Sequence, residues 1–391
     1  MKITFCIPSK NNLRYLKGSI NSIRKNSAVE HDIIVFLDAD NDGTEKWLIE
    51  NQVTYIKNNT NQPKGIAFGY NRCIEAAKTD VVCMFHADMY MARGFDNAIS
   101  KHISPGKVVS GTRIEPPLHP EGREKIVKHF GMYPEDFQEL EFNQYCEALI
   151  IENKDKTTRG IFAPWAIYRE DIVKIEMHDE DFHSYQEDSD MFNRFILNGY
   201  EIVQTWEGFV YHLTCRGGQF QDGIEKVTQD SAFHLMKDKA MKSYLRKWGC
   251  WIKNDEYQYP MLSPKYDIAF KVTNCSIEAL AALEPWCSTI SSDAGYAKWL
   301  EEEQKKTTFN MWKRVKPWNA PLENDIIVEF DIKKLTQQSF QLIQQLPQII
   351  AQSGEVGEFE LDIFKVKIRA LNDYQDRLIT NSDPYYTNQL L

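Results

Sequence analysis

The stretch "VVCMFHADMYM", residues 81–91, begins as an unbroken apolar run and then turns polar at once. Residues 81–85 supply the apolar run, which is typical of a strand buried on both faces of a parallel sheet. His86 and Asp88 follow immediately. A strand that ends at the protein surface would explain a polar side chain here. An imidazole and a carboxylate two residues apart also suit a bound metal ion that carries a charged ligand.

Apolar runs and helical patterns alternate on the N-terminal side of this stretch. Residues 2–8 and 31–38 predict strands, and residues 53–59 predict an edge strand. Residues 13–26 and 65–78 place apolar side chains at helical spacing and predict helices. The alternation predicts an α/β fold in which helices cover both faces of a parallel sheet.

Polar residues follow three of these predicted strands, at Pro8–Ser9, Asp38–Asp40 and His86–Asp88. The carboxyl ends of parallel strands meet at one edge of a sheet, where ligands bind in folds of this class. We therefore expect the three polar ends to lie close together. Carboxylates that gather in this way repel one another unless a cation joins them.

The remaining chain divides into two parts by its patterns. Residues 104–160 carry weak signals, and the proline-rich stretch over residues 104–125 predicts a path over the surface. Beyond residue 250 the chain is rich in tryptophan, and residues 334–352 predict a helix interrupted by Pro347. We predict one domain over residues 1–250 and a smaller α+β appendage of unknown role over residues 251–391.

Composition excludes several classes of protein. The 391 residues have a formal net charge of −10, which argues against nucleic acid or an anionic membrane as the main partner. The eight cysteines include no Cys-x-x-Cys pair and indicate buried thiols in a reducing compartment. No apolar run approaches the roughly 20 residues that span a bilayer. These features predict a cytoplasmic protein without a membrane span.

A second acidic motif lies within "SYQEDSDMFNRF", residues 184–195. Glu187, Asp188 and Asp190 fall in the first turn of a predicted helix, where the helix dipole favours anions. Asp190 and Arg194 stand four residues apart and can pair along the helix surface. Packing so many carboxylates together is unfavourable, and a bound hydroxyl substrate or metal ion would offset that repulsion.

Four segments in order resemble glycosyltransferase family 2, whose members are inverting, nucleotide-sugar-dependent enzymes of the GT-A fold. The segments are "CIPSKNNLRYLKGSINSI", "HDIIVFLDADNDGTEKW", "KGIAFGYNRCIEAAKTDVVCMFHADMYM" and "QEDSDMFNRFILNGYEI". The resemblance covers about residues 1–220. It implies a Rossmann-like domain with a mixed, mostly parallel sheet, whose nucleotide-binding part covers about residues 1–110 and whose acceptor part covers about 111–250.

The resemblance also implies roles for particular residues. A divalent cation, Mn²⁺ or Mg²⁺, would bind to Asp88 and His212, Asp188 would be the general base, and Glu187 would orient the acceptor. Contacts to the nucleotide sugar are implied for Pro8, Ser9, Asn11, Asp38, Asp40, Gly65, Asn71, His86, Ala87 and Arg216. Trp165, as an exposed stacking platform for a sugar ring, and Asp190 are expected on the acceptor side.

This sequence departs from the family pattern at the end of the predicted strand over residues 81–85. His86 stands where the family's first metal-site aspartate is usual, so one negative charge is missing, and Leu37 replaces an aspartate often found at the second strand end.

The partners implied are a nucleotide-diphosphate sugar and a glycan or other hydroxyl acceptor. One alternative is a catalytically degenerate protein of the same fold that binds nucleotide sugar or glycan. A nucleotidyltransferase is a weaker alternative, because no glycine-rich phosphate loop follows the first strand.

Overall fold

The computed structural model describes residues 1–381, and the chain divides into two compact units. The N-terminal unit holds Met1–Met236 and Asn254–Pro260. The C-terminal unit holds Lys237–Lys253 and the chain from Met261 onward. The domain boundary that the sequence places after residue 250 stays a prediction.

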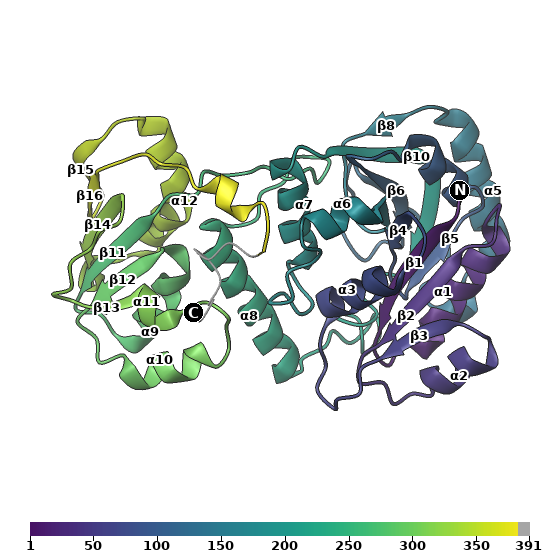
Figure 1. The fold of residues 1–391 in the computed structure, drawn as a ribbon, viewed down its shortest axis with the longest axis horizontal. Helices are drawn as coiled ribbons and strands as arrows, with labels where there is room; N and C mark the ends of the chain where they lie inside the picture. The colour runs from purple at the N-terminus through teal and green to yellow at the C-terminus, as the bar shows by residue number, and fades with distance from the viewer. Residues whose placement is uncertain (382–391) are drawn as a thin grey trace. The chain divides into compact units, whose positions relative to one another are not determined.

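The N-terminal unit is built on a sheet in which β3, β2, β1, β4, β9, β6, β10 and β5 lie side by side (Figure 1). In chain order, its first five strands are β1 (Ile3–Ser9), β2 (Asp32–Leu37), β3 (Thr54–Lys57), β4 (Val81–Met84) and β5 (Met89–Met91). The next five strands are β6 (Lys107–Glu115), β7 (Lys125–Val127), β8 (Thr157–Thr158), β9 (Trp165–Tyr168) and β10 (Glu201–His212). Strands β3, β2, β1 and β4 are parallel, whereas β9 is antiparallel to β4 and β6. The expected mixed, mostly parallel sheet is confirmed, and β3 lies at its edge.

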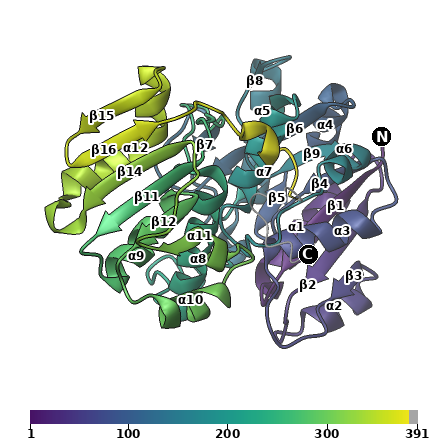
Figure 2. The ribbon, with the colours of Figure 1, turned by 60° about the vertical axis from the view of Figure 1, so that its left-hand side comes forward.

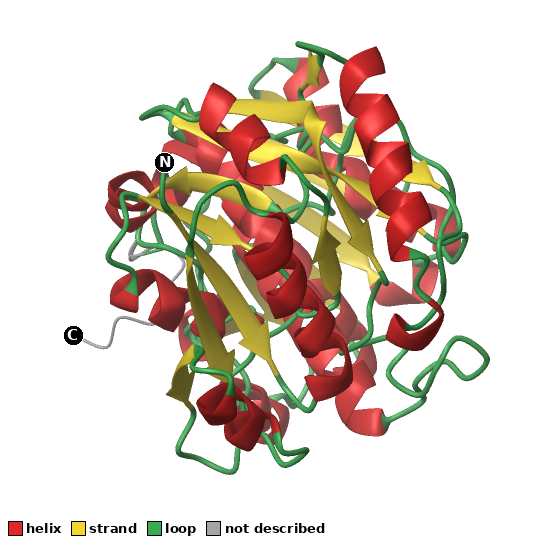
Figure 3. Ribbon diagram, turned by 90° about the vertical axis from the view of Figure 1, so that its right-hand side faces the viewer, coloured by secondary structure: helices red, strands yellow, loops and turns green. Residues whose placement is uncertain are grey.

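Helices flank this sheet, as Figure 3 shows. They are α1 (Leu13–Asn26), α2 (Thr44–Glu50), α3 (Ile66–Ala76), α4 (Phe95–His102), α5 (Glu139–Glu152), α6 (Arg169–Lys174) and α7 (Glu187–Leu197). Leu16, Ile20 and Ile23 recur at helical spacing along α1 and are buried in the same core as the strands. The predicted alternation of strand and helix over the first 90 residues is confirmed.

The expectation that residues 104–125 wander over the surface is wrong for the segment that forms a central strand. Residues 107–115 form β6, which lies between β9 and β10 and buries Val108 and Val109 completely. Helix α5 covers residues 139–152. Pairing with two strands from much later in the chain fixes β6, and local sequence patterns do not contain that information.

The C-terminal unit has its own sheet in the order β13-β12-β11-β14-β16-β15 (Figure 2). Its strands are β11 (Ile268–Thr273), β12 (Thr289–Ser292), β13 (Val315–Pro317), β14 (Ile326–Asp331), β15 (Gly357–Leu361) and β16 (Phe364–Ile368). The later helices of the chain are α8 (Ser231–Trp248), α9 (Ile277–Leu283), α10 (Ala297–Gln304), α11 (Met311–Arg314) and α12 (Gln337–Ser353). The predicted helix around Pro347 is confirmed as α12. Within residues 1–381, no helix is both long and apolar enough to cross a membrane.

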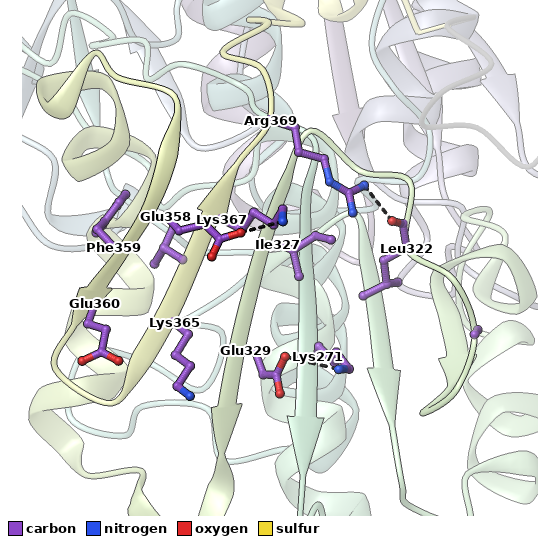
Figure 4. A pocket seen from close by; sticks show the side chains of 12 residues that line it. Lys271, Leu322, Ile327, Glu329, Glu358, Phe359, Glu360, Lys365, Lys367 and Arg369 are labelled. Atoms are coloured by element: carbon purple, nitrogen blue, oxygen red, sulfur yellow. Dashed lines mark hydrogen bonds and ion pairs between the residues drawn. The ribbon is translucent and has the colours of Figure 1, made fainter.

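One face of the C-terminal sheet carries charged side chains (Figure 4). Alternate residues such as Phe270 and Val328 point into the core, whereas Lys271, Glu329 and Lys367 line a cleft of about 620 Å³ on the strands. Residues 318–325 form the loop that connects β13 to β14. Lys271 pairs with Glu329 at 3.2 Å, and Lys367 pairs with Glu358 at 2.6 Å. Cross-strand ion pairs of this kind suit a solvated face.

Candidate active site

Five polar residues meet at one edge of the N-terminal sheet because the strands that carry them run in the same direction. Strand β9 is antiparallel to both β4 and β6, so β6 and its parallel partner β10 run the same way as β1 and β4. The carboxyl ends of these strands bring together Ser9, His86, Asp88, Glu115 and His212. The expected convergence of polar strand ends is therefore confirmed.

His86, Asp88 and His212 form a candidate metal centre. Their potential ligand atoms all lie within 4.8 Å of one another. His212 Nε2 lies 3.4 Å from Asp88 Oδ1, and the two imidazole rings are 5.4 Å apart between centroids. One carboxylate and two imidazoles suit a divalent transition metal such as Mn²⁺ better than Mg²⁺, which prefers oxygen ligands. The residues present thus fit the cation that the resemblance implies.

Electrostatics sets the charge of each candidate metal ligand in this cluster. Burial and, to a smaller extent, the neighbouring His212 lower the pKa of His86 to about 4, so the His86 imidazole is neutral at pH 7. Burial alone would raise the pKa of Asp88, but His212 holds it well below its usual range. Burial lowers the pKa of His212, but the carboxylates of Asp88 and Glu115 raise it to about 9. His212 therefore carries the positive charge that a cation would replace.

A cleft of about 300 Å³ opens beside the metal centre. Nine residues expected to bind the nucleotide sugar or the metal line it, namely Pro8, Ser9, Asp38, Gly65, His86, Ala87, Asp88, His212 and Arg216. Sequence reasoning missed other residues of the lining, among them Lys10, Phe162, Tyr185 and Cys215. They follow strands or lie in loops, where no periodic pattern marks them.

Arg216 offers hydrogen-bond donors beside the metal centre. Its backbone N–H donates to Asp88 Oδ2 at 3.0 Å, and its side chain is only 3% exposed. Nη2 donates to the carbonyl of Met132. Nε and Nη1 are buried and have no partner among residues 1–381. Two such guanidinium donors next to a cation site suit an anionic ligand such as a phosphate group.

Asp38 shapes the wall of the cleft through the loop around Gly65. The Asp38 carboxylate accepts hydrogen bonds from the backbone N–H groups of Lys64 and Gly65, both at 2.8 Å, and from the side-chain amide of Asn58 at 2.8 Å. Gly65 has a φ of 89°, and a Cβ atom there would lie 2.1 Å from the carbonyl oxygen of His183. Only glycine fits this position, since both the backbone conformation and the close approach exclude a side chain.

Glu187 and Asp188 lie at the start of α7 and differ in their tendency to ionise. Burial and the charge of Asp188 raise the pKa of Glu187 to about 8. Burial raises the pKa of Asp188 to about 6, against the opposing effects of the Arg113 charge and the Trp165 indole. At pH 7 Asp188 is ionised and can accept a proton, whereas Glu187 is protonated and can donate a hydrogen bond. Neither carboxyl lines the cleft, but Tyr185, two residues before Glu187, does.

Residues 4–175 match the family model of glycosyl transferase family 2. This chain carries a glycosyl transferase family 2 domain. The matched segment includes β1 to β4 and the His86–Asp88 strand end. It stops before α7 and β10, so Glu187, Asp188 and His212 lie outside the matched segment. No curated protein matches the sequence.

Several solved structures are similar to this chain at low identity. Residues 1–349 of TarS from S. aureus share 12% identity with a TM-score of 0.36, covering 55% of this chain and 59% of that one. GalNAc-T7 with UDP, GalNAc and Mn²⁺ shares 14% with a TM-score of 0.41, covering 54% and 43%. The mannosyltransferase PcManGT from Pyrobaculum calidifontis, in complex with GDP-Man and Mn²⁺, shares 17% with a TM-score of 0.39, covering 62% and 61%. This chain thus spans less than two thirds of each of these chains.

The expectation that Trp165 is an exposed stacking platform is wrong for this family 2 domain. Trp165 is completely buried and packs edge-to-face on Phe195, with ring centroids 5.3 Å apart. It starts β9, opposite Met84 of β4, and its ring packs against Phe192 and Phe195 of α7. Its indole lowers the pKa of Asp188, which places it behind the candidate base and not on a sugar-binding surface.

Asp190 does not face an acceptor either, and its pair with Arg194 is not on the surface. Both side chains are 0% exposed, and Arg194 Nε donates to Asp190 Oδ2 at 2.9 Å. The remaining guanidinium donors bind the carbonyls of Ile175 and Met177 at 2.7 and 2.6 Å. Arg194 thus ties α7 to the segment that directly follows α6. Its role is structural.

Three expected nucleotide contacts lie away from the cleft lining. The amide of Asn71 donates to the carbonyl of His178 at 2.9 Å and accepts from the N–H of His178 at 2.9 Å. Asn11 accepts from the N–H of Asn41 at 2.8 Å, and its own N–H donates to Asp40 at 3.3 Å. These side chains tie loops together around the site.

Proposed function

We propose that the N-terminal unit is an inverting glycosyltransferase that moves a sugar from a nucleoside diphosphate to a hydroxyl acceptor, such as a glycan. The observation that carries this proposal is the cluster of His86, Asp88 and His212 on a cleft where two donors of Arg216 have no hydrogen-bond partner among residues 1–381. Its position at the strand ends of a family 2 domain supports a donor site.

The donor end of the site would bind the diphosphate. A cation held by His86, Asp88 and His212 would neutralise the diphosphate and stabilise it as a leaving group. Arg216 Nε and Nη1 would donate to phosphate oxygens, because both are buried donors without a hydrogen-bond partner in the described part of the chain. We infer that Mn²⁺ serves better than Mg²⁺, since two of the three side chains are imidazoles.

Asp188 would take the proton of the acceptor hydroxyl as that oxygen attacks the anomeric carbon. The bond from this carbon to the diphosphate oxygen breaks in the same displacement, so the configuration inverts and no protein nucleophile is needed. Glu187, which is protonated at pH 7, would donate a hydrogen bond that orients the acceptor. A positioned base contributes on the order of 10²–10⁴-fold to the rate.

The two carboxyls predict a bell-shaped pH profile. Asp188 must be ionised, so kcat/KM should fall as the pH drops through about 6. Glu187 must keep its proton, so kcat/KM should fall again as the pH rises through about 8. These values belong to the interacting pair. Measuring kcat/KM from pH 5 to 9 checks the profile. Glu187→Gln, whose amide donates at every pH, should lose the alkaline fall; an unchanged alkaline fall in this variant would contradict the role of Glu187.

The donor can be identified by incubating the protein with a panel of nucleotide sugars and Mn²⁺ and measuring the nucleoside diphosphate released. We expect release from one donor, faster with an acceptor glycan, and none without the cation. Binding without any release, with or without acceptors, would instead favour a degenerate protein that only binds its ligand. Absence of both nucleotide-sugar binding and diphosphate release would contradict the proposed donor site.

A further inference from the structure

Glu115 lies at the end of β6 with its carboxylate fully engaged. The side chain is 2% exposed. Its Oε1 lies 2.9 Å from His212 Nδ1 and accepts from Arg113 Nη1 at 2.8 Å. Its Oε2 accepts from Lys125 Nζ at 2.8 Å. One carboxylate thus joins the candidate metal centre to two buried cations.

Three adjacent strands place these groups in one row. Strand β6 pairs in parallel with β7, where Arg113 lies opposite Lys125, and with β10, where Arg113 lies opposite Val210. Arg113 and Glu115 are two residues apart and so point to the same face of the sheet. His212 ends β10 at the same edge. The position of Glu115 beside His212 is therefore a consequence of strand register.

We propose that Glu115 is a positioning residue that holds the Nδ1–H of His212 and thereby directs Nε2 toward the cation. This inference rests on the proposed function. With Nδ1–H donated to Glu115, the only ring nitrogen left to act as a ligand is Nε2, which lies 3.4 Å from Asp88 Oδ1. A carboxylate behind a metal-bound histidine fixes the ring orientation and the tautomer, and it makes the imidazole a better ligand.

Charge balance alone does not require Glu115 to contact the imidazole. Arg113 Nη2 also donates to Glu124 Oε1 at 3.2 Å, so Arg113 has a second buried carboxylate that does not touch His212. Glu124 is 5% exposed, similar to Glu115. Glu124 therefore provides a matched control, because its loss disturbs the same charge network and leaves the imidazole contact in place.

The test is a calorimetric titration of the full chain with Mn²⁺ alone. We expect Glu115→Gln to bind Mn²⁺ about 10–100-fold more weakly than the wild type, the usual effect of removing such a partner. Glu124→Gln should bind with nearly wild-type affinity, and His212→Ala should lose binding. Glu115→Asp keeps the negative charge in the network but shortens the side chain, so the carboxylate no longer reaches the imidazole at hydrogen-bond distance. It should also weaken Mn²⁺ binding, and it serves as the test variant if Glu115→Gln does not fold.

A spectroscopic readout separates positioning from general packing. In ¹⁵N-histidine-labelled protein saturated with diamagnetic Zn²⁺, the Nδ1–H signal of His212 should be visible in the wild type and in Glu124→Gln, and shifted or lost in Glu115→Gln. Wild-type Mn²⁺ affinity and an unchanged Nδ1–H signal in Glu115→Gln would overturn this inference alone. A wild-type protein that binds no Mn²⁺ would overturn the metal-dependent donor site, and the role of Glu115 with it.

Discussion

Asp188→Asn should lower kcat by about 10²–10⁴-fold while the protein still binds its nucleotide sugar. Asparagine has nearly the same size as aspartate but cannot accept the proton of the acceptor hydroxyl. The donor cleft is lined by other residues, so the dissociation constant of the donor should hardly change. Steady-state kinetics together with calorimetric binding of the donor measures both quantities.

Asp222→Asn is the matched control for this prediction. Asp222 is exposed and absent from the cleft lining, so its substitution should leave kcat unchanged. If Asp188→Asn kept more than a tenth of the wild-type kcat, the proton would have another acceptor and the role of Asp188 would be wrong. If it instead weakened donor binding, Asp188 would belong to the donor site.

Asp190→Ala should cost about 3–5 kcal/mol of the free energy of unfolding, because it leaves the Arg194 guanidinium buried without its carboxylate. Both side chains are 0% exposed, and Arg194 Nε lies 2.9 Å from Asp190 Oδ2. Replacing both residues together with apolar ones, as in Asp190→Leu with Arg194→Met, should recover much of that loss, since no uncompensated charge stays behind. Urea-induced unfolding of the full chain gives these values.

An exposed pair with the same four-residue spacing provides the comparison. Glu50 pairs with Lys46 at 3.8 Å on α2, and both side chains are more than half exposed. Glu50→Ala should change the free energy of unfolding by no more than about 0.5 kcal/mol. Similar losses for Asp190→Ala and Glu50→Ala would contradict a structural role for the buried pair.

The parts of the site that sequence predicts are those set by local patterns. The apolar run ending at residue 85 marks a buried strand, and the rule for parallel sheets then places His86 and Asp88 beside Ser9. Alternation of short strands with amphipathic helices is a local signal, so the first four strands and α1 to α3 were all predictable.

The parts that sequence does not predict depend on pairing between distant segments. Glu115 lies at the end of β6, a strand that no clear local pattern predicts. Only the pairing of β6 with β10 brings Glu115 to His212. Trp165 was expected at the surface because nothing in "FAPWAIY" shows that β9 inserts between β4 and β6. Asp190 was expected on an exposed helix face, and the chain around Ile175 and Met177 covers it. Local sequence patterns do not predict which residues are buried by contacts with distant segments of the chain.

The most direct test of a metal-dependent donor site is calorimetric titration of the protein with UDP and with GDP, each with and without Mn²⁺, in the wild type and in Asp88→Ala. Thermal unfolding checks that the variant is folded. We predict that one nucleotide binds about tenfold or more tightly with Mn²⁺, a difference of about 1.4 kcal/mol, and that Asp88→Ala abolishes this gain. Equal affinity with and without Mn²⁺, or a gain that persists in Asp88→Ala, would contradict the metal centre at His86, Asp88 and His212.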